Sequence, residues 1–302
     1  MTLNPETRKV TTLCRMCDHG CGMVVTVENG IPVAVEGSRK HPFNKGWLCA
    51  KGRAALDVFN SPSRLKTPMI RKGSALEECS WEEALGYASE KMLNLRETYG
   101  PQSLALYYGE GVGHQEIRSY IKRFANVYGT PNFCGVGSIC NTSRTIAETL
   151  TFGGLTKPDI PNTRLLIVWG ANPMVSHEPC PPAEIEKLRK RAGQLMVVDP
   201  RTTETARKAD LHLAVKPGTD GLLVLNVLHV FFREELWDRP FVEKWVQGFQ
   251  EFSDAVKDAS FSPENGQRRT GIKPENVRSL ARAYATSKPA SPTSCSPRPA
   301  RA

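Results

Sequence analysis

No run of apolar residues in this sequence of 302 residues is long enough to cross a bilayer. The longest candidate, Leu222 to Phe232, is interrupted by Asn226 and His229 and falls short of the roughly 20 residues that a spanning helix requires. The N-terminal residues contain neither an apolar secretory core nor a twin-arginine pair. We therefore expect a cytoplasmic protein with no direct membrane span, which would reach a membrane only through a partner.

The signatures of nucleic-acid binding are also missing. Basic residues are scattered along the chain, and there is neither an RNA-binding aromatic signature nor a zinc-finger spacing with paired histidines. The 40 Lys and Arg residues outnumber the 31 Asp and Glu residues, which gives a formal net charge of +9. This surplus suits an anionic partner such as a nucleotide, a pyrophosphate or a small oxyanion.

Disulfide frameworks are typical of smaller secreted chains, whereas this chain is large enough to bury a core in two or three domains. Its nine cysteines include four that are clustered near the N-terminus. Such a cluster favours thiolate ligands in a reducing compartment.

The first segment, residues 1–60, combines these cysteines with two short alternating runs, Met23 to Val27 and Ile31 to Val35. Asn29 and Gly30 separate the runs, and an Asn-Gly pair accepts the positive φ angles of a tight hairpin turn. We predict a small β-rich domain that is held together by a metal centre rather than by an apolar core.

The next segment, residues 61–133, begins with a helical pattern for which Ser80 is the predicted N-cap and Gly100-Pro101 the end. A strand-like run, Leu104 to Tyr108, and a second amphipathic helix follow. We interpret this segment as the first part of an α/β domain.

Residues 134–285 alternate between apolar strands and helices. The expected elements are strands at Leu165 to Trp169, Leu195 to Val198 and Leu211 to Val215, and helices at Ala183 to Ala192 and Leu222 to Leu236. Near-continuous apolar strands separated by helices indicate a parallel sheet covered on both faces. The fold class is therefore α/β, with a doubly wound, Rossmann-like domain of nucleotide-binding type.

The last stretch, residues 286–302, is rich in Ser, Pro, Ala and Arg and has no periodicity. We predict a disordered tail or a truncated end.

The cysteine spacing favours an iron-sulfur cluster. Cys14, Cys17 and Cys21 are close together, and Cys49 follows after 27 residues. Three thiolates of one loop can bind three corners of a cubane while a distant fourth completes it. Zinc is the alternative, but a structural zinc site usually consists of two Cys-x2-Cys knuckles, and the second knuckle is absent here.

Arg15 and Lys51 flank these ligands. Either can be a solvated surface charge. A cation beside a negatively charged cluster would instead raise its reduction potential and could bridge to a second redox group.

The motifs together resemble the molybdopterin guanine dinucleotide-dependent oxidoreductases. They are Cys14-Arg-Met-Cys17-Asp-His-Gly-Cys21, Gly46-Trp-Leu-Cys49-Ala-Lys51-Gly52, Arg64-Leu-Lys-Thr-Pro68 and Ser80-Trp-Glu-Glu-Ala-Leu, followed by Trp169-Gly170-Ala-Asn172-Pro173, Asp199-Pro-Arg201 and Pro217-Gly218-Thr219-Asp220. This superfamily includes formate dehydrogenases, thiosulfate and polysulfide reductases, and dimethyl sulfoxide reductases. The resemblance spans roughly residues 13–285, and members are generally much longer, so the chain is expected to be truncated relative to the family.

The resemblance implies a [4Fe-4S] cluster and molybdenum or tungsten held by two molybdopterin guanine dinucleotides (bis-MGD). The residues implied for one dinucleotide are Gly170, Asn172, Asp199, Arg201, Gly218 and Asp220. Their chemistry is suitable, because glycines let backbone approach phosphate, arginine pairs with phosphate, and a carboxylate accepts hydrogen bonds from guanine or ribose. Taken singly, these loops are also ordinary turn sequences.

A nicotinamide-binding Rossmann domain is the sharper alternative, because Asp199 ends a second strand where a ribose-binding acid would lie. The first strand, however, runs into Gly-Ala-Asn-Pro rather than into a G-x-G-x-x-G phosphate loop.

The resemblance places the protein ligand to the metal in the segment that contains Cys140, whose soft thiolate suits the position. A buried free cysteine is the alternative for Cys140, and Cys134 is a second candidate. Arg144 could draw an anion toward the metal or could be a helix-surface arginine. The remaining cysteines are interpreted as structural or incidental, namely Cys79, Cys180 and Cys295.

The activity implied is a two-electron oxidation or reduction of a small substrate or oxyanion, with electrons passing singly through the pterin, Lys51 and the cluster. A formate dehydrogenase of this family would have histidine directly after the metal ligand, whereas this chain has Asn141, which puts formate in doubt. An iron-sulfur electron-transfer subunit is the expected partner. Two alternatives remain, an iron-sulfur electron-transfer subunit without metal chemistry and a non-redox hydratase with the same cofactor.

Overall fold

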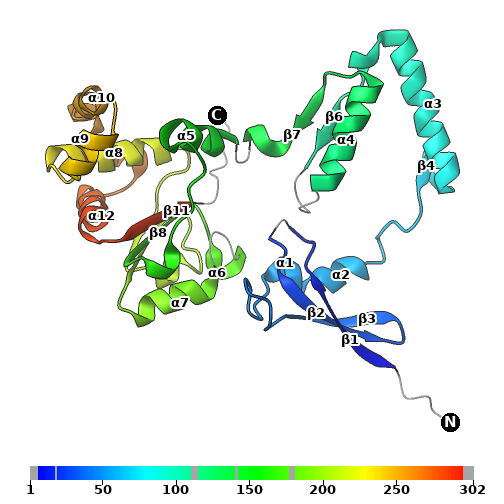
Figure 1. The fold of residues 1–302 in the computed structure, drawn as a ribbon, viewed down its shortest axis with the longest axis horizontal. Coiled ribbons are helices and arrows are strands. Elements are labelled where there is room, and N and C mark those ends of the chain that lie inside the picture. Colours follow the sequence, from blue (N-terminus) through cyan, green and yellow to red (C-terminus); the bar gives the residue numbers. More distant parts are fainter. Residues whose placement is uncertain (1–5, 18, 110–114, 140–141, 177–180, 295–302) are drawn as a thin grey trace. The chain divides into compact units, whose positions relative to one another are not determined.

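The computed structural model describes residues 6–17, 19–109, 115–139, 142–176 and 181–294. The chain divides into two compact units, residues 1–138 and 139–302 (Figure 1). The division falls after residue 138 rather than after residue 133, because strand β7 (Phe133–Gly135) pairs in parallel with β6 (Leu106–Tyr108) of the first unit.

The first unit begins with an antiparallel sheet of three strands in the order β1-β2-β3. Its strands are β1 (Thr7–Leu13), β2 (Gly22–Glu28) and β3 (Ile31–Gly37). Asn29 and Gly30 connect β2 to β3 with φ angles of 51° and 81°, so the predicted hairpin turn is confirmed. Two short helices follow, α1 (Ala50–Arg53) and α2 (Ala55–Phe59).

The rest of the first unit contains a hairpin of β4 (Met69–Lys72) and β5 (Ala75–Glu78), the long helix α3 (Trp81–Tyr99), the turn η1 (Pro101–Ser103), helix α4 (Gln115–Tyr128) and the turn η2 (Val136–Ile139). The Ser80 hydroxyl accepts a hydrogen bond from the Glu83 backbone N–H at 3.1 Å, which confirms the predicted N-cap of α3. Gly100, with φ of 81°, ends the helix as expected.

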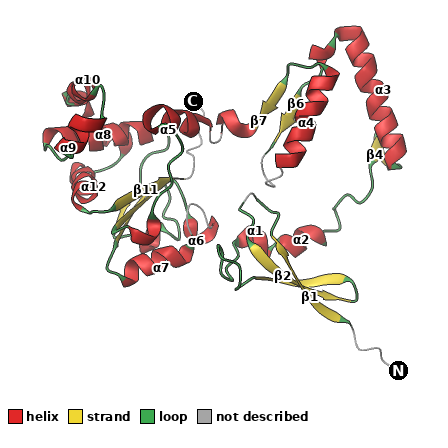
Figure 2. Cartoon of the chain, in the orientation of Figure 1, coloured by secondary structure: helices red, strands yellow, loops and turns green. Residues whose placement is uncertain are grey.

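The second unit is built around a parallel sheet with the strand order β10-β9-β8-β11 (Figure 2). Its strands are β8 (Leu165–Trp169), β9 (Gln194–Val198), β10 (Leu211–Leu213) and β11 (Ala290–Ser294). The helices and turns between them are α5 (Thr142–Phe152), η3 (Ile160–Asn162), α6 (Pro173–Ser176), α7 (Pro182–Lys190), η4 (Ala206–Lys208), α8 (Asp220–Arg233), α9 (Arg239–Trp245), α10 (Phe249–Val256), η5 (Ala259–Phe261), α11 (Pro263–Thr270) and α12 (Pro274–Thr286).

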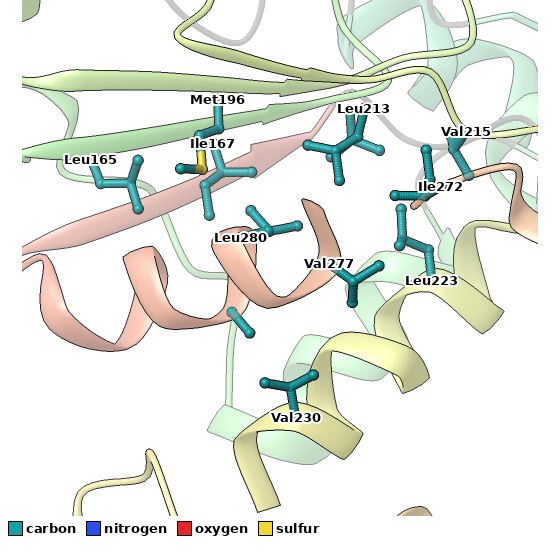
Figure 3. Close-up of a cluster of buried hydrophobic side chains, with 12 residues drawn as sticks. Leu165, Ile167, Met196, Leu213, Val215, Leu223, Val230, Ile272, Val277 and Leu280 are labelled. Carbon is teal, nitrogen blue, oxygen red and sulfur yellow. The ribbon is translucent and has the colours of Figure 1, made fainter. Parts of the chain in front are cut away.

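Side chains alternate between the two faces of this sheet and form two cores. Leu165 and Ile167 of β8 pack with Leu223 of α8 and Leu280 of α12 on one face (Figure 3). The intervening residues of β8 pack on the other face, where the core includes Ile185 and Leu188 of α7. Because helices cover both faces, the predicted doubly wound α/β architecture is confirmed.

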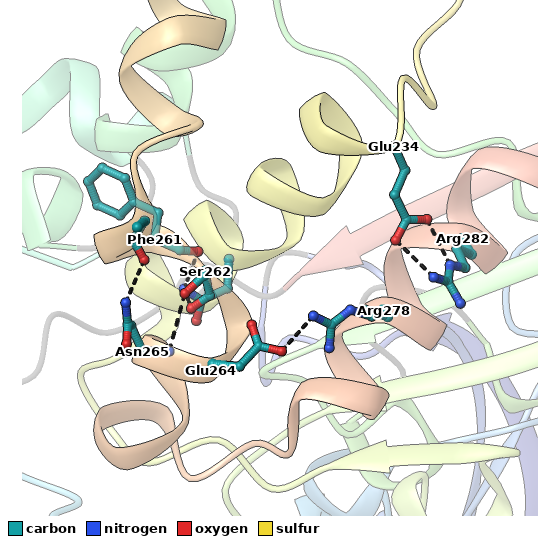
Figure 4. A network of polar contacts seen from close by, with 9 residues as sticks. Glu234, Phe261, Ser262, Glu264, Asn265, Arg278 and Arg282 are labelled. Carbon is teal, nitrogen blue, oxygen red and sulfur yellow. Dashed lines mark hydrogen bonds and ion pairs between the residues drawn. The ribbon is translucent and has the colours of Figure 1, made fainter.

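Ion pairs and hydrogen bonds join helix α12 to helix α11 and to the C-terminal end of helix α8 (Figure 4). Arg282 of α12 donates two hydrogen bonds to the Glu234 carboxylate, at 2.8 and 2.9 Å. Arg278 donates to Glu264 of α11 at 2.5 Å. These contacts fix α12 against the end of α8 and against α11.

Strand β11 corrects the prediction of a disordered or truncated tail for residues 290–294, while residues 295–302 lie outside the described part of the chain. Residues 290–294 pair in parallel with β8, and the Arg164 backbone N–H donates to the Pro289 carbonyl at 2.8 Å. The strand has little apolar character, and Pro292 stands within it, which a sheet tolerates at an edge. Among the described residues, no helix combines the length and apolar character that crossing a membrane requires.

Candidate functional site

The four predicted cluster ligands lie at one end of the first sheet. Cys14, Cys17 and Cys21 occupy the loop between β1 and β2, and Cys49 is the residue before α1. The Cys14 backbone N–H donates to the Cys21 carbonyl at 2.7 Å, which closes this loop on itself. Three of the thiols are buried, while that of Cys17 is half-buried.

Burial, with smaller contributions from the neighbouring thiols of Cys17, Cys14 and Cys49, raises the pKa of the Cys21 thiol to about 11. All four sulfurs are therefore close enough to interact electrostatically. A thiol in this environment keeps its proton at neutral pH, so metal binding here must release protons.

The number and type of donors test which metal centre the site fits. A zinc ion would bind four sulfurs about 2.3 Å from one point, whereas a cubane binds each thiolate to a different iron. The four interacting thiols supply one donor for each iron of a cubane. Across the described ranges, no three His, Cys, Asp or Glu side chains are arranged as ligands of a single metal ion.

Asn44 holds the two cysteine-bearing segments together. Its side-chain Oδ1 accepts from the Gly22 N–H at 2.8 Å, and its Nδ2 donates to the Gly22 carbonyl at 2.9 Å. The Nδ2 also donates to the Trp47 carbonyl at 2.8 Å, and the side chain is 3% exposed. Asn44 was not predicted from the sequence. Its position between Cys21 and Cys49 was the one feature that could have indicated its role.

Lys51 and Arg15 are exposed, and Lys51 lies in the first turn of α1. The residue after Lys51, Gly52, is buried and packs against Cys14, since a Cβ atom built there would lie 3.5 Å from the Cys14 Sγ. The backbone of Lys51 is therefore fixed beside the cluster ligands, while its ammonium group extends to the surface.

The predicted dinucleotide residues follow the strands of the second unit's parallel sheet. β8 lies between β9 and β11 in the strand order. Open α/β sheets bind ligands outside the carboxyl ends of their strands. Gly170 follows β8, Asp199 follows β9, and Gly218 and Asp220 follow β10, so these predicted residues gather at the carboxyl edge of the sheet.

A cavity of about 730 Å³ lies in this unit. Its lining includes Trp169, Gly170 and Asp220 from the carboxyl edge and residues 290–293 from β11. At its wall the Trp169 indole Nε1 donates to Asp220 Oδ1 at 2.7 Å. Gly170 has φ of 60°, a conformation that favours glycine and turns the chain away from β8.

Asn172 organises the neighbouring loop instead of lining this cavity. Its Oδ1 accepts from the backbone N–H and the hydroxyl of Thr205, at 3.2 and 2.8 Å, and its Nδ2 donates to Glu204 at 2.7 Å. This last hydrogen bond is the main cause that holds the pKa of Glu204 below its usual range.

Asp199 is 8% exposed, and its Oδ1 accepts from the Arg201 backbone N–H at 2.8 Å. Arg201 and Gly218 are exposed, and Gly218 has φ of 82°. Of the six predicted dinucleotide residues, only Gly170 and Asp220 therefore belong to the cavity lining, while the other four shape or flank the same edge of the sheet.

Arg144 also lines the cavity but is engaged in an ion pair. Its Nε donates to Glu148 at 2.6 Å, and Glu148 accepts a second hydrogen bond from the Thr156 N–H at 2.7 Å. The Arg144 hydrogen bond is the main cause that lowers the pKa of Glu148. This pairing favours the interpretation of Arg144 as a helix-surface arginine over a role in drawing an anion toward the metal.

The predicted metal ligand Cys140 and its neighbour Asn141 lie outside the described residues, as do Cys180 and Cys295. Cys134 is exposed in β7, and Cys79 is half-buried directly after β5.

Comparisons with known proteins match both units. Residues 7–61 match the model of the molybdopterin oxidoreductase Fe4S4 domain, and residues 64–263 match that of molybdopterin oxidoreductase. Formate dehydrogenase H of Escherichia coli is 33% identical over 94% of this chain and 41% of its own length. Periplasmic nitrate reductase of Desulfovibrio desulfuricans is 31% identical, over 94% of this chain and 39% of its own length.

A solved structure is similar as well. Acetylene hydratase from Pelobacter acetylenicus matches with a TM-score of 0.79 and 26% identity, over 94% of this chain and 40% of the other. The chain thus spans about 40% of the length of the relatives cited here.

Proposed function

Because the chain belongs to the molybdopterin oxidoreductase family, we propose that the protein acts in a two-electron oxidation or reduction of a small substrate, with single electrons relayed through a [4Fe-4S] cluster. The observation that carries this proposal is the set of four interacting thiols within the matched Fe4S4 domain. Three of these thiols are buried, and burial keeps water away from the cluster that would relay the electrons.

Cys14, Cys17, Cys21 and Cys49 would hold the cluster, one thiolate to each iron. Lys51 would lie on the electron path, since the adjacent Gly52 packs on Cys14. Its exposed ammonium would offset part of the negative charge that an arriving electron adds.

The carboxyl edge of the sheet in the second unit would hold one molybdopterin guanine dinucleotide. The backbone at Gly170 and Gly218 would admit phosphates, Arg201 would pair with one of them, and the Asp220 carboxylate would accept hydrogen bonds from the guanosine part. Asn172 and Asp199 would hold these loops in place through their hydrogen bonds to residues 201–205.

When bound, bis-MGD would supply molybdenum or tungsten as the site of two-electron chemistry. Cys140 is the proposed protein ligand to that metal, because a soft thiolate suits it. Arg144 would have a positioning role in this proposal, since its pairing with Glu148 braces α5, which begins at Thr142, two residues after Cys140 in the sequence.

A turnover assay tests the proposal. Cofactor-loaded protein is mixed with formate, thiosulfate or nitrate and a redox dye, and both the dye and the product are measured. A substrate-dependent colour change is expected. No dye change with any of these substrates, together with hydration of acetylene in the absence of dye, would instead favour the hydratase alternative, which the likeness to acetylene hydratase supports. Cluster-bearing protein that binds no pterin would favour an electron-transfer subunit.

A further inference from the structure

The segment that leads to Cys49 is strongly basic. Residues 37–56 contain five Lys or Arg residues and no Asp or Glu. Four of the cations, Arg39, Lys40, Lys45 and Arg53, are exposed, and none of them pairs with a carboxylate in the part of the chain that the structure describes. We call these four residues the basic rim.

Contacts within the segment place three members of the basic rim around one turn. The Arg39 side chain packs over Gly46, where an added Cβ would lie 3.0 Å from the Arg39 Cγ. Lys45 directly precedes Gly46. Arg53 donates to the Leu48 carbonyl at 3.0 Å. The positive charge therefore surrounds the turn that ends at the cluster ligand Cys49.

An aromatic contact leads from this surface to another cluster ligand. Phe43 lies within the same basic segment and is 39% exposed. Its ring lies 5.9 Å from the His19 ring, centroid to centroid. The His19 Nδ1 in turn lies 3.8 Å from the Cys17 Sγ. Phe43 and His19 thus form a short chain of contacts from the surface to a ligand sulfur.

We propose that the basic rim and Phe43 form the docking surface for an acidic one-electron carrier protein, which exchanges electrons with the cluster through Phe43, His19 and Cys17. The inference rests on the proposed function, since it requires the cluster. Docking surfaces of this kind combine charged steering at the rim with an aromatic contact in the centre. One electron passes in each encounter, from the reduced to the oxidised centre, and no covalent bond forms or breaks.

Charge complementarity favours an acidic carrier protein over other anionic partners of this surface. Electrostatic steering by exposed cations accelerates association by 10- to about 1,000-fold and weakens as salt screens it. A small anion would need a cation at the end of a pocket, whereas these four cations are exposed and share one short segment with an exposed aromatic ring. A protein with an acidic face around its redox centre fits that arrangement.

The test uses a plant-type [2Fe-2S] ferredoxin as the acidic carrier and measures the second-order rate constant of electron exchange with the cluster by stopped-flow absorbance. The variant Lys40→Glu with Lys45→Glu reverses two rim charges. The control Lys122→Glu with Arg123→Glu makes the same charge change on exposed residues of α4. We expect at least a tenfold loss of rate in the rim variant at low salt, a smaller loss at high salt, and little change in the control.

Two further measurements separate docking from other effects. Iron content and the rate of oxidation by a neutral quinone are expected to stay unchanged in the rim variant. Phe43→Ala should slow electron exchange between the cluster and the carrier when the carrier is at saturating concentration. The Kd for the carrier should change much less in this variant than in the rim variant.

Equal rates in the rim variant and the control, or a rate in the parent that does not depend on salt, would overturn the docking surface while leaving the proposed function intact. A parent protein without iron would overturn the cluster relay itself, and the docking proposal with it.

Discussion

The Trp169 indole Nε1 donates a hydrogen bond to Asp220 Oδ1 at 2.7 Å and so ties the end of β8 to the first residue of α8. Both side chains line the cavity at the carboxyl edge of the sheet. The bond holds the Asp220 carboxylate at a fixed place in the wall. A half-buried tryptophan thus supports a residue that we propose to contact the dinucleotide.

We expect Trp169→Phe to destabilise the second unit by about 1.5–3 kcal/mol, because a hydrogen bond to a charged group is lost while the aromatic packing is largely kept. Urea denaturation measures the change in the free energy of unfolding. Retained pterin dinucleotide should also decrease, since Asp220 is no longer held. Trp245→Phe is the control, because Trp245 is exposed. Equal stability and pterin content in both variants would contradict this role.

Cys17→Ser should abolish the cluster and loosen the N-terminal domain, since the change removes a ligand and with it the link that closes the loop. Iron content and visible absorbance measure the loss. Cys79→Ser is the control, because Cys79 is half-buried after β5 and outside the cysteine loop. Unchanged iron and absorbance in Cys17→Ser would show that Cys17 is no ligand.

Asn44→Ala should lower iron content and stability without removing any ligand. The change leaves the N–H and carbonyl of Gly22 and the carbonyl of Trp47 without their partner, at a cost of about 1–3 kcal/mol for each buried group that water cannot reach. Asn60→Ala, at the end of α2, is the exposed control. Iron content and a thermal unfolding temperature of Asn44→Ala equal to those of the parent would contradict this role.

The pair Arg282–Glu234 should make stability depend on pH. Arg282 holds the pKa of the Glu234 carboxyl below its usual range, so the stabilisation is present above the unfolded pKa of about 4.3 and is lost as the pH falls through the lower folded value. A double-mutant cycle of Arg282→Gln and Glu234→Gln should give a coupling of about 0.2–1 kcal/mol at pH 7, because the pair is largely exposed. The same coupling measured below the folded pKa would contradict the assignment.

Local patterns were enough to predict the main elements of both units. The Asn29-Gly30 turn, the Ser80 cap and the alternation of apolar strands with helices depend on neighbouring residues, and each is present in the structure. Strand β11 depends on pairing with β8, more than 100 residues earlier, and its Ala-Ser-Pro-Thr-Ser sequence gave no apolar signal of its own.

The candidate site was also predicted only in part from the sequence. Cysteine spacing predicted four thiols that interact in the structure, and the order of the loops predicted residues that gather at the carboxyl edge of the sheet. The contacts of Asn44 with Gly22, of Arg144 with Glu148 and of Trp169 with Asp220 were not predicted. They join side chains to particular partners, and residue type alone does not specify which partner the folded chain provides.

In the proposed function, this chain binds an iron-sulfur cluster together with a pterin-bound metal. Anaerobic metal analysis of the purified chain tests this binding, with iron, zinc, molybdenum and tungsten quantified together and released pterin measured by fluorescence. We predict about four irons per chain, from one cubane with one iron for each thiolate, together with molybdenum or tungsten and pterin. Zinc without iron after anaerobic preparation would contradict the cluster assignment, and iron without pterin would contradict the proposed metal chemistry.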